Sequence, residues 1–336
     1  MRALPWLEIA WLTLVFAALL LVSGNAGNQR AEPAAARVEP GAHVELVQLA
    51  HGERGLRDAS GHVTPLRPYR RIAAGGGVAD ELLLALSEPE RVVALTQYAR
   101  THQPRGYLYG QRAELPSKID LERLRELKLD LLVLNHLGAP AELERVRDAG
   151  IEVFDLGEMR GLSTLAKNCL MLGTLLGDEA RGKLLFEQLE RRMRAVAADI
   201  PAAQRKHALY VSAYAGQLFG GAAGTSYHDV LTAAGLVDVA VPLYRDWMHY
   251  DPEQVLLLDP EIIVTSTTSA SQLCRMAALD RLRACRTPDQ RGIVDIDEAA
   301  IGNPGLGMLD AAEAIRDRVY GPIRPVRAAA AARPVP

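Results

Sequence analysis

Cysteine is scarce in this chain and follows no metal-binding pattern. The 336 residues include 3 cysteines, and none of them forms the CxxC pair that zinc and iron–sulfur sites use. Cys169 falls in an apolar stretch predicted to be helical, 162–176, and is expected to be a packing residue. Cys274 and Cys285 flank a short stretch predicted to be helical, 275–284. An oxidising compartment would let these two pair, but sequence leaves their geometry open.

Positive charge and aromatic residues are also in short supply. Lys and Arg number 38 against 41 Asp and Glu, which gives a net charge of -3. Nucleic-acid binding needs a basic face, so we expect no nucleic-acid partner. Aromatic residues make up only 5% of the chain, so tyrosines that gather outside apolar runs become candidates for ligand contact.

Motifs of common enzyme classes are missing. Gly75-Gly76-Gly77 lies between a predicted strand and a predicted helix, where backbone amides can bind phosphate. Asp80 occupies the last glycine position of the Rossmann pattern, and no Walker lysine follows. Ser212 and Ser226 lack the glycines of a nucleophile elbow. We therefore predict that the protein is not an enzyme and uses no cofactor.

The N-terminus has the pattern of an export signal. Arg2 precedes an apolar run at 9–22, and small residues follow at 23–26. This pattern predicts a signal peptide over 1–26, with an uncleaved membrane anchor as the alternative. Residues 27–40, rich in Ala and Pro, are predicted to be a linker, and 323–336 a disordered tail.

One segment occurs twice. IDLERLRELKLDLLVLN at 119–135 returns as YDPEQVLLLDPEIIVTS at 250–266, each a short helix, a turn and an apolar strand. Two copies predict two similar lobes, at 41–177 and 201–322. Between them, 178–200 has apolar residues at helical spacing and predicts one long helix. The fold class predicted is α/β, with two three-layer lobes, mainly parallel sheets, a single bridging helix and a ligand cleft between the lobes.

This arrangement resembles the class III periplasmic binding proteins, which serve ABC importers of iron siderophores, cobalamin and haem. The segments that carry the resemblance are 58–72, 80–95, 115–135, 143–156 and 250–264. The resemblance implies that one exposed glutamate on each lobe docks to arginines of the permease, and Glu122 and Glu253 match those positions. First-turn helix acids favoured by the macrodipole are the alternative interpretation. The glycine loop 75–77 departs from the family, which usually has Ser and Pro there.

Candidate ligand-binding residues follow predicted strands in three clusters. The first holds cations, imidazole and phenols suited to an anionic, aromatic or iron-chelating ligand, and it contains Tyr98, Arg100, His102, Arg105, Tyr107, Tyr109 and Arg112. The second is Asn135 with His136. The third contains Tyr244, Arg245, Trp247 and His249, with Tyr214, Tyr227 and His228 as further candidates. Solvated loops and core packing are the competing interpretations.

The predicted function is capture of an iron–siderophore, cobalamin or haem-like chelate in the periplasm and its delivery to an ABC importer permease. The chain is expected to act as a monomer. A haem would need one donor, for which Tyr98, His102, His228 and His249 are candidates. A siderophore would be gripped through its organic arms, so no protein metal ligand is predicted. The alternatives are a membrane-anchored sensor or assembly module with the same fold and, less favoured, an enzyme that uses the cleft.

Overall fold

The computed structural model describes residues 44–97, 100, 109–116, 118–136, 138–276, 278–287 and 291–322. These residues belong to one compact unit, Val38–Pro336. The predicted targeting segment, the linker and the tail lie outside them. Within the described ranges, no helix combines the length and the apolar character needed to cross a membrane.

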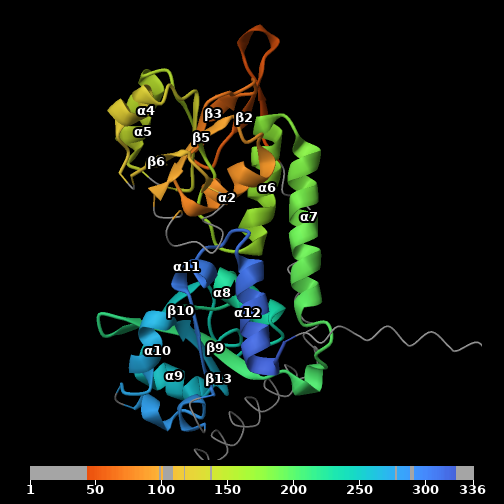
Figure 1. Cartoon of the computed structure of the whole chain (residues 1–336), viewed down its shortest axis with the longest axis vertical. Coiled ribbons are helices and arrows are strands. Elements are labelled where there is room, and N and C mark those ends of the chain that lie inside the picture. Colours follow the sequence, from red (N-terminus) through yellow and green to blue (C-terminus); the bar gives the residue numbers. More distant parts are fainter. Residues whose placement is uncertain are drawn as a thin grey trace, which may run out of the picture. The chain divides into compact units, whose positions relative to one another are not determined.

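The N-terminal lobe is built on a parallel five-stranded sheet (Figure 1). Its strand order is β6-β5-β4-β7-β8, with bounds β4 Ile72–Ala74, β5 Val92–Thr96, β6 Ala113–Leu115, β7 Leu131–Leu134 and β8 Glu152–Asp155. The strands are short and almost wholly apolar, which suits a sheet covered on both faces. Helices α4 (Leu121–Glu126) and α5 (Pro140–Asp148) cover one face, where Leu124, Leu143 and Val146 enter the core.

A small antiparallel sheet precedes this lobe's first parallel strand. It contains β1 (Leu46–Gln48), β2 (Arg54–Arg57) and β3 (Val63–Pro65), with the short 3-10 helix η1 (Ala50–Gly52) between the first two. The turn at 58–62 joins β2 to β3. One carboxylate oxygen of Asp58 accepts hydrogen bonds from the backbone of Ser60 and His62, and the other accepts one from the backbone of Asp155. The turn is thereby fixed to β8.

The C-terminal lobe has a mixed sheet, with order β12-β10-β9-β13-β14 and β11 paired to β9. The strands are β9 His207–Tyr214, β10 Gln217–Gly221, β11 Val237–Asp238, β12 Trp247–Tyr250, β13 Ile262–Ser266 and β14 Ile293–Ile296. Strands β9, β11, β13 and β14 are parallel, whereas β10 and β12 are antiparallel to their neighbours. The sequence did not predict strands at 217–221 and 247–250.

Helices cover both faces of this second sheet. They are α8 (Ser226–Ala233), α9 (Pro252–Leu258), α10 (Thr267–Leu273), α11 (Glu298–Ile301) and α12 (Met308–Tyr320), with 3-10 turns η3 (Ala202–Gln204), η4 (Leu279–Arg281) and η5 (Ala284–Arg286). Residues 275–284 were expected to be helical, but the described part of this stretch has only 3-10 turns. A disulfide joins Cys274 to Cys285, whose Cα atoms are 5.6 Å apart, so the pairing that sequence left open is present.

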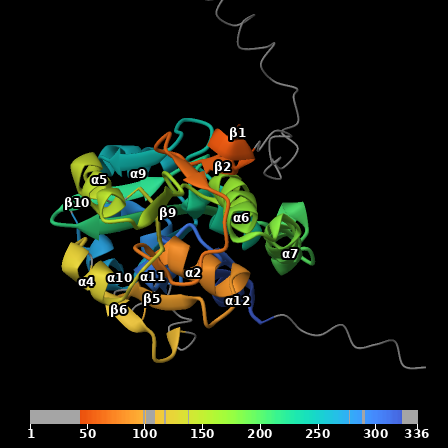
Figure 2. The same ribbon diagram turned by 90° about the horizontal axis from the view of Figure 1, so that it is seen from above.

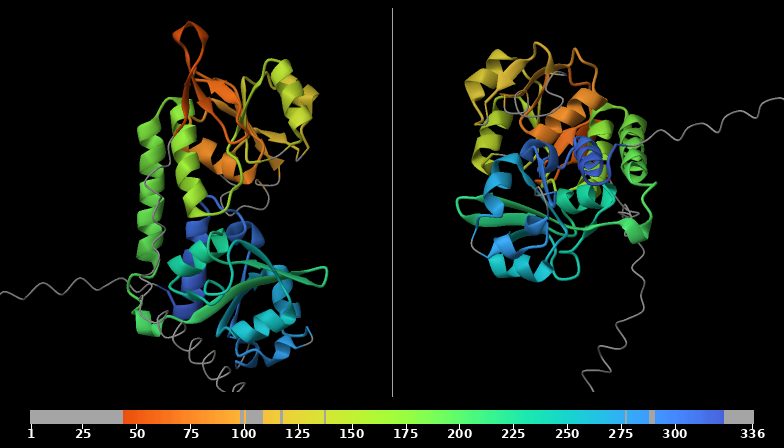
Figure 3. Two further views of the ribbon diagram at one scale, coloured as in Figure 1. Left: turned by 180° about the vertical axis from the view of Figure 1, so that it is seen from behind. Right: turned by 60° about the horizontal axis from the view of Figure 1, so that its bottom comes forward.

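The chain passes from one lobe to the other through one helix, α7 (Glu179–Val196), at the place where a bridging helix was expected (178–200), and α7 packs antiparallel on α6 (Leu162–Leu176) of the N-terminal lobe. The two helices lie side by side (Figures 2 and 3). A Cβ atom at Gly182 would lie 2.2 Å from the Cys169 carbonyl oxygen, so glycine permits this close packing. Cys169 is fully buried there, in line with its expected packing role. The 18 residues of α7 extend about 27 Å, and α7 contacts α2 (Gly77–Leu86) of one lobe and α8 and α12 of the other.

The internal repeat has the structure that its pattern predicts. The first copy forms α4 and β7, and the second forms α9 and β13. Asp120 caps α4 by accepting hydrogen bonds from the Glu122 and Arg123 amides. Asp251 occupies the same cap position on α9, where its amide is bound by the Gln254 side chain. Glu122 and Glu253 are therefore both exposed first-turn residues.

Asp80, the residue that breaks the Rossmann pattern, is buried in α2. Its carboxyl group accepts a hydrogen bond from the Thr96 amide at 3.0 Å and another from the Tyr109 hydroxyl at 3.3 Å. Burial raises the pKa of Asp80 to about 8 even though these hydrogen bonds oppose the shift. Asp80 therefore ties α2 to β5 rather than binding a phosphate.

Replacing Asp80 with Asn is expected to flatten the pH dependence of the free energy of unfolding. The folded chain holds a proton on this carboxyl that the unfolded chain has released, because its pKa is raised to about 8 in the fold. The free energy of unfolding of the wild-type protein should therefore fall by roughly 1.4 kcal/mol per pH unit as the pH rises from about 5 to about 8. Asparagine keeps an acceptor for Thr96 without this ionisation. Urea unfolding at several pH values measures the slope, with Glu88→Gln at an exposed site as control; equal slopes for Asp80→Asn and wild type would contradict the assignment.

Candidate ligand-binding site

A pocket of about 480 Å³ is lined by residues of both lobes. On the N-terminal side it meets the loops that follow β4 and β7, and on the C-terminal side it meets α8 and the segment around α11. Carboxyl ends of parallel strands are the usual ligand-binding edge of such sheets. The described lining residues are Gly77, Val78, Asn135, His136, Glu158, Met159, Tyr227, Glu298, Ala299, Gly302, Asn303 and Pro304.

The glycine loop at 75–77 shapes the N-terminal wall. A Cβ atom at Gly76 would lie 1.9 Å from the Asn135 side-chain oxygen, so only glycine lets these two loops approach. That oxygen is buried and accepts no hydrogen bond from the described residues. His136 has a φ of 55°, and its side chain is 75% exposed at 3.9 Å from the Asp155 carboxylate. The first residues of α2 thus reach the pocket through backbone, and Asn135 and His136 supply side chains.

Tyr227 supplies an aromatic side chain to the C-terminal wall, and Tyr210 and Trp247 contact it. The rings of Tyr210 and Tyr227 stack with centroids 3.8 Å apart, and Trp247 meets Tyr227 edge-on at 5.2 Å. Both phenols donate to the Glu298 carboxylate, Tyr210 at 2.8 Å and Tyr227 at 3.3 Å. Trp247 is 39% exposed, so it is not a core residue. An aromatic surface therefore continues from Tyr227 in the pocket lining to Trp247, which is not among the described lining residues.

Burial, with Glu298 as a neighbour, raises the pKa of both tyrosines and keeps them protonated. Burial raises the pKa of the Tyr227 phenol first, and the adjacent Glu298 carboxylate raises it further. The pKa of the more deeply buried Tyr210 is raised by burial first, and then by its neighbours Tyr227 and Glu298. A phenol that donates to a carboxylate cannot offer a phenolate to a metal without disturbing that hydrogen bond. Tyr227 is therefore suited to stacking rather than to metal coordination.

Carboxylates dominate the charge at the described rim. Glu158 and Glu298 line the pocket, and Glu158 pairs with Arg160 at 3.2 Å. Arg160 also bonds Asp246, which joins the segment after β8 to the segment before β12. The cation-rich rim that the first sequence cluster predicted is not formed by these residues.

Two buried contacts hold the lobes together, and each is a carboxylate of one lobe at the start of a helix of the other. Glu81 of α2 accepts hydrogen bonds from the Leu306 amide at 2.5 Å and the Asn303 side chain at 3.0 Å, just before α12. In the opposite direction, Asp229 of α8 accepts a hydrogen bond from the Leu162 amide at 2.7 Å, at the start of α6. Acids at helix N-termini accept hydrogen bonds from amides that have no partner within the helix, and their negative charge interacts favourably with the positive end of the helix dipole. These reciprocal caps fix the separation of the two pocket walls.

Removing either cap is expected to lower the free energy of unfolding. Glu81→Ala and Asp229→Ala each leave buried amides without an acceptor, which costs about 1–3 kcal/mol. Glu88→Ala, at an exposed site just after α2, is the matched control. Urea unfolding of the three variants measures the difference. Losses equal to that of the control would show that the caps do not hold the lobes.

The structure brings some of the predicted ligand residues together and separates others. Asn135, His136 and Tyr227 line the pocket, and Trp247 contacts Tyr227. Tyr214 is 76% exposed at the end of β9. Tyr244 packs on Tyr250, Arg245 is exposed, and His249 contacts Phe219. None of these four is among the described lining residues.

Much of the first cluster cannot be placed at the pocket. Tyr98, His102, Arg105 and Tyr107 lie outside the described residues. Arg100 bonds the Gly110 carbonyl, Arg112 bonds the Val92 carbonyl, and Tyr109 is buried, so these three residues pack within the N-terminal lobe. His228, a candidate haem donor, is held by Asp238 at 2.9 Å. Burial lowers the pKa of His228, but the hydrogen bond to Asp238 and the charges of Asp238 and Asp229 together raise it above its ordinary value.

Sequence reasoning did not identify several lining residues, notably Glu158, Met159, Glu298 and Asn303. Glu298 could have been found, because it lies two residues after the parallel strand β14, at the strand end where ligand-binding residues gather. Asn303 and Met159 carry no local signal. Among the described residues, no group of three or more His, Cys, Asp and Glu side chains could hold a metal ion.

Comparisons with known proteins agree with this architecture. A family model described as periplasmic binding protein matches residues 72–288. A search of curated proteins found no match.

Several solved structures share the fold. A possible iron-binding periplasmic protein from Staphylococcus epidermidis superposes with a TM-score of 0.65 at 17% identity, over 76% of this chain and 100% of that one. The periplasmic haem-binding protein HutB of Vibrio cholerae has a TM-score of 0.62 at 20% identity, over 74% and 98%. The vitamin B12-binding protein BtuF of Vibrio cholerae has a TM-score of 0.57 at 21% identity, over 75% and 97%. With two α/β lobes, a pocket between them and a family match over most of its length, the chain belongs to the periplasmic binding protein family.

Proposed function

We propose that this chain is an exported solute-binding protein that captures a metal chelate and delivers it to the permease of an ABC importer. The cargo classes are an iron–siderophore, cobalamin or a haem-like chelate. Fold relatives named for haem, vitamin B12 and iron binding support this range. The disulfide between Cys274 and Cys285 supports an oxidising location such as the periplasm.

The observation that carries the proposal is the pocket between the lobes. Its walls come from two separate sheets, and the reciprocal caps of Glu81 and Asp229 hold those walls at a fixed distance. A site formed in advance binds without the cost of ordering loops or closing domains. Such a pocket suits a carrier that must take up a rigid cargo and surrender it unchanged.

The chemistry of the walls indicates how the cargo is held. Tyr227 and Trp247 present aromatic surface to a flat organic face. The Glu158 and Glu298 carboxylates line the pocket and can accept hydrogen bonds, so the cargo face in this pocket carries donors rather than carboxylates. The cargo is thus gripped through its organic part while its metal keeps its own ligands.

Delivery to a permease requires a second binding surface on the chain, separate from the pocket. Glu122 and Glu253 are exposed, and they occupy the same position of the two repeat copies. Two carboxylates, one on each lobe, can pair with two cations of a membrane partner and so define its position.

Native mass spectrometry of the protein purified from an iron-starved exporting host tests the proposal. We expect one bound molecule per chain, whose absorption spectrum distinguishes haem, a corrinoid and a ferric chelate. The recovered molecule should be chemically unchanged and stoichiometric after incubation. A protein that is isolated empty and binds none of haemin, cyanocobalamin or ferric siderophores would overturn the carrier function, and a converted molecule would indicate an enzyme.

A further inference from the structure

The two proposed docking points are not alike in shape, although the repeat makes them equivalent in sequence. On the C-terminal lobe, Glu253 lies in the first turn of α9, and Leu257 follows four residues later. Residues at this spacing share one face of a helix. Leu257 is 73% exposed, and only Tyr214 is more exposed among the large apolar residues described. The C-terminal docking point is therefore a projecting apolar side chain beside a carboxylate.

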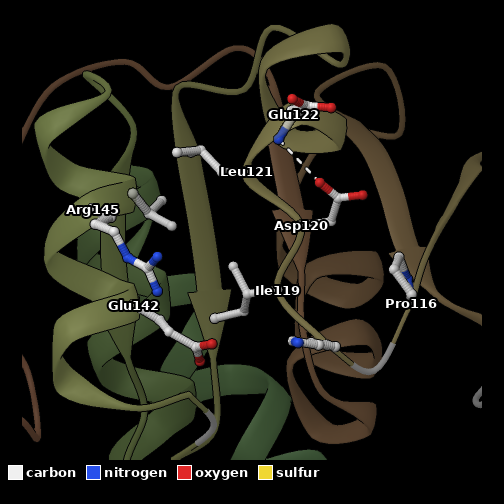
Figure 4. Close-up of a pocket in the computed structure, with 9 residues that line it drawn as sticks. Pro116, Ile119, Asp120, Leu121, Glu122, Glu142 and Arg145 are labelled. Carbon is white, nitrogen blue, oxygen red and sulfur yellow. Dashed lines mark hydrogen bonds between the residues drawn. The ribbon is translucent and has the colours of Figure 1, made fainter.

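The N-terminal docking point is hollow. A groove of about 530 Å³ lies between α4 and α5 and includes Glu122 in its lining. Figure 4 shows Ile119 and Leu121 between the side chains of α5 and the carboxylates of Asp120 and Glu122. A second cavity of about 350 Å³ shares Ile119, Asp120 and Glu142 with it and reaches Gly75. The groove therefore has an apolar floor, and its rim carries three carboxylates, Asp120, Glu122 and Glu142, against two cations, Lys118 and Arg145.

The repeat explains why only one lobe carries the projecting leucine. Where α9 has Leu257, the first copy has Glu126, which pairs with Arg123 at 3.0 Å. In the N-terminal copy, Arg123 thus neutralises the charge of Glu126, whereas in the C-terminal copy Leu257 is exposed to solvent. Isolated exposed leucines are common on surfaces. Leu257 is notable because it stands beside Glu253. In the repeat, Glu253 is equivalent to Glu122, which lines the groove.

We propose that the membrane partner is bound by a socket on one lobe and a plug on the other, so that it fits in only one orientation. The proposal rests on the proposed function, in which the permease meets Glu122 and Glu253. The socket between α4 and α5 takes a long basic side chain, whose apolar stem lies on Ile119 and Leu121 and whose charge reaches Glu122 and Asp120. The plug, Leu257, enters an apolar recess of the partner next to a cation that pairs with Glu253. The carboxylates on both lobes attract cations of the partner, and the different shapes of the two docking points set its orientation.

Binding of the purified, fluorescently labelled full chain to spheroplasts of the exporting host, deleted for this protein, tests the inference. Leu257→Glu, which gives α9 the side chain found in the first copy, should raise the half-saturating concentration tenfold or more. The control is Leu184→Glu on α7, where the leucine is 49% exposed, and it should bind as wild type does. Ile119→Trp, which fills the socket, should weaken binding by a similar factor. Thermal unfolding confirms that the variants are folded.

Salt separates the two kinds of contact. Raising the ionic strength to about 0.5 M screens exposed charges, so the loss caused by Glu253→Ala should shrink while the loss caused by Leu257→Glu persists. If Leu257→Glu binds no worse than Leu184→Glu, the plug is disproved. Wild-type binding by Ile119→Trp would disprove the socket. The double variant Glu122→Ala/Glu253→Ala separates a failure of this inference from a failure of the proposed function. Normal binding by this double variant would reject the proposed docking function itself.

Discussion

Replacing both Glu122 and Glu253 with alanine is expected to reduce cargo uptake by the host more than 100-fold. Charge pairs that become enclosed at an interface have coupling energies of about 1.5 kcal/mol or more each. The loss of two such pairs corresponds to about 3 kcal/mol, which exceeds a 100-fold change in affinity. Both residues are exposed first-turn residues of short helices, away from the pocket lining. Cargo affinity of the isolated protein should therefore stay within about twofold.

Uptake of the labelled cargo by a strain that carries each variant measures the effect, and isothermal titration calorimetry measures cargo affinity. The control is Glu126→Ala/Glu144→Ala, which makes the same change in net charge. Both control residues are exposed and form ion pairs with arginines of their own helices. Unaltered uptake by the docking variant would reject the docking role of these glutamates. A loss shared by the control would point to general electrostatics instead.

The repeat was the part of the fold most readily predicted from the sequence. An apolar run such as Ile262–Ser266, preceded by a turn residue and an amphipathic segment, specifies a buried strand after a helix in both copies. The parallel strands β4, β5 and β7 have the same local signature, because each is short and largely apolar. Local pattern suffices where both faces of a strand are covered.

The antiparallel strands of the C-terminal lobe could not be predicted in this way. Strand β10 ends in Gly220 and Gly221, and glycine normally argues against a strand interior. A Cβ atom at Gly220 would lie 2.5 Å from the Tyr210 carbonyl oxygen, so close approach of another strand explains the glycine. That reason is tertiary and has no trace in the local sequence.

Strand β12, which was also not predicted, explains how the residues of the third candidate cluster are divided. Tyr244, Arg245, Trp247 and His249 were candidates for ligand contact, with core packing as the alternative, and the second half of this cluster is β12. Side chains alternate between the two faces of a strand. Met248 and Tyr250 therefore pack against the core, while Trp247 meets Tyr227. The cross-lobe caps were missed for a comparable reason, since Glu81 and Leu306 are far apart in the sequence and acids on helices ordinarily face water.

Trp247→Ala is expected to weaken cargo binding at least tenfold, and Tyr227→Ala/Trp247→Ala about 100-fold. Burial of a large apolar side chain contributes about 1.5–3 kcal/mol, and favourable ring geometry adds about 0.5–1.5 kcal/mol. Trp247 is only partly buried, and its ring leans edge-on against Tyr227, so truncation opens the aromatic wall without leaving a core cavity. Tyr227→Ala also removes a donor from Glu298. Calorimetric titration with the cargo identified by mass spectrometry gives the affinities.

Tyr214 provides the matched control for this prediction. It is an aromatic residue 76% exposed at the end of β9, and Tyr214→Ala should bind cargo as wild type does. Tyr227→Phe retains the ring and removes only the hydroxyl, so it should retain most of the affinity if stacking dominates. Affinity of Trp247→Ala within about twofold of wild type would exclude the tryptophan from the site. A loss in Tyr227→Phe equal to that in Tyr227→Ala would assign the binding energy to the hydroxyl and its bond to Glu298 instead of to the aromatic face.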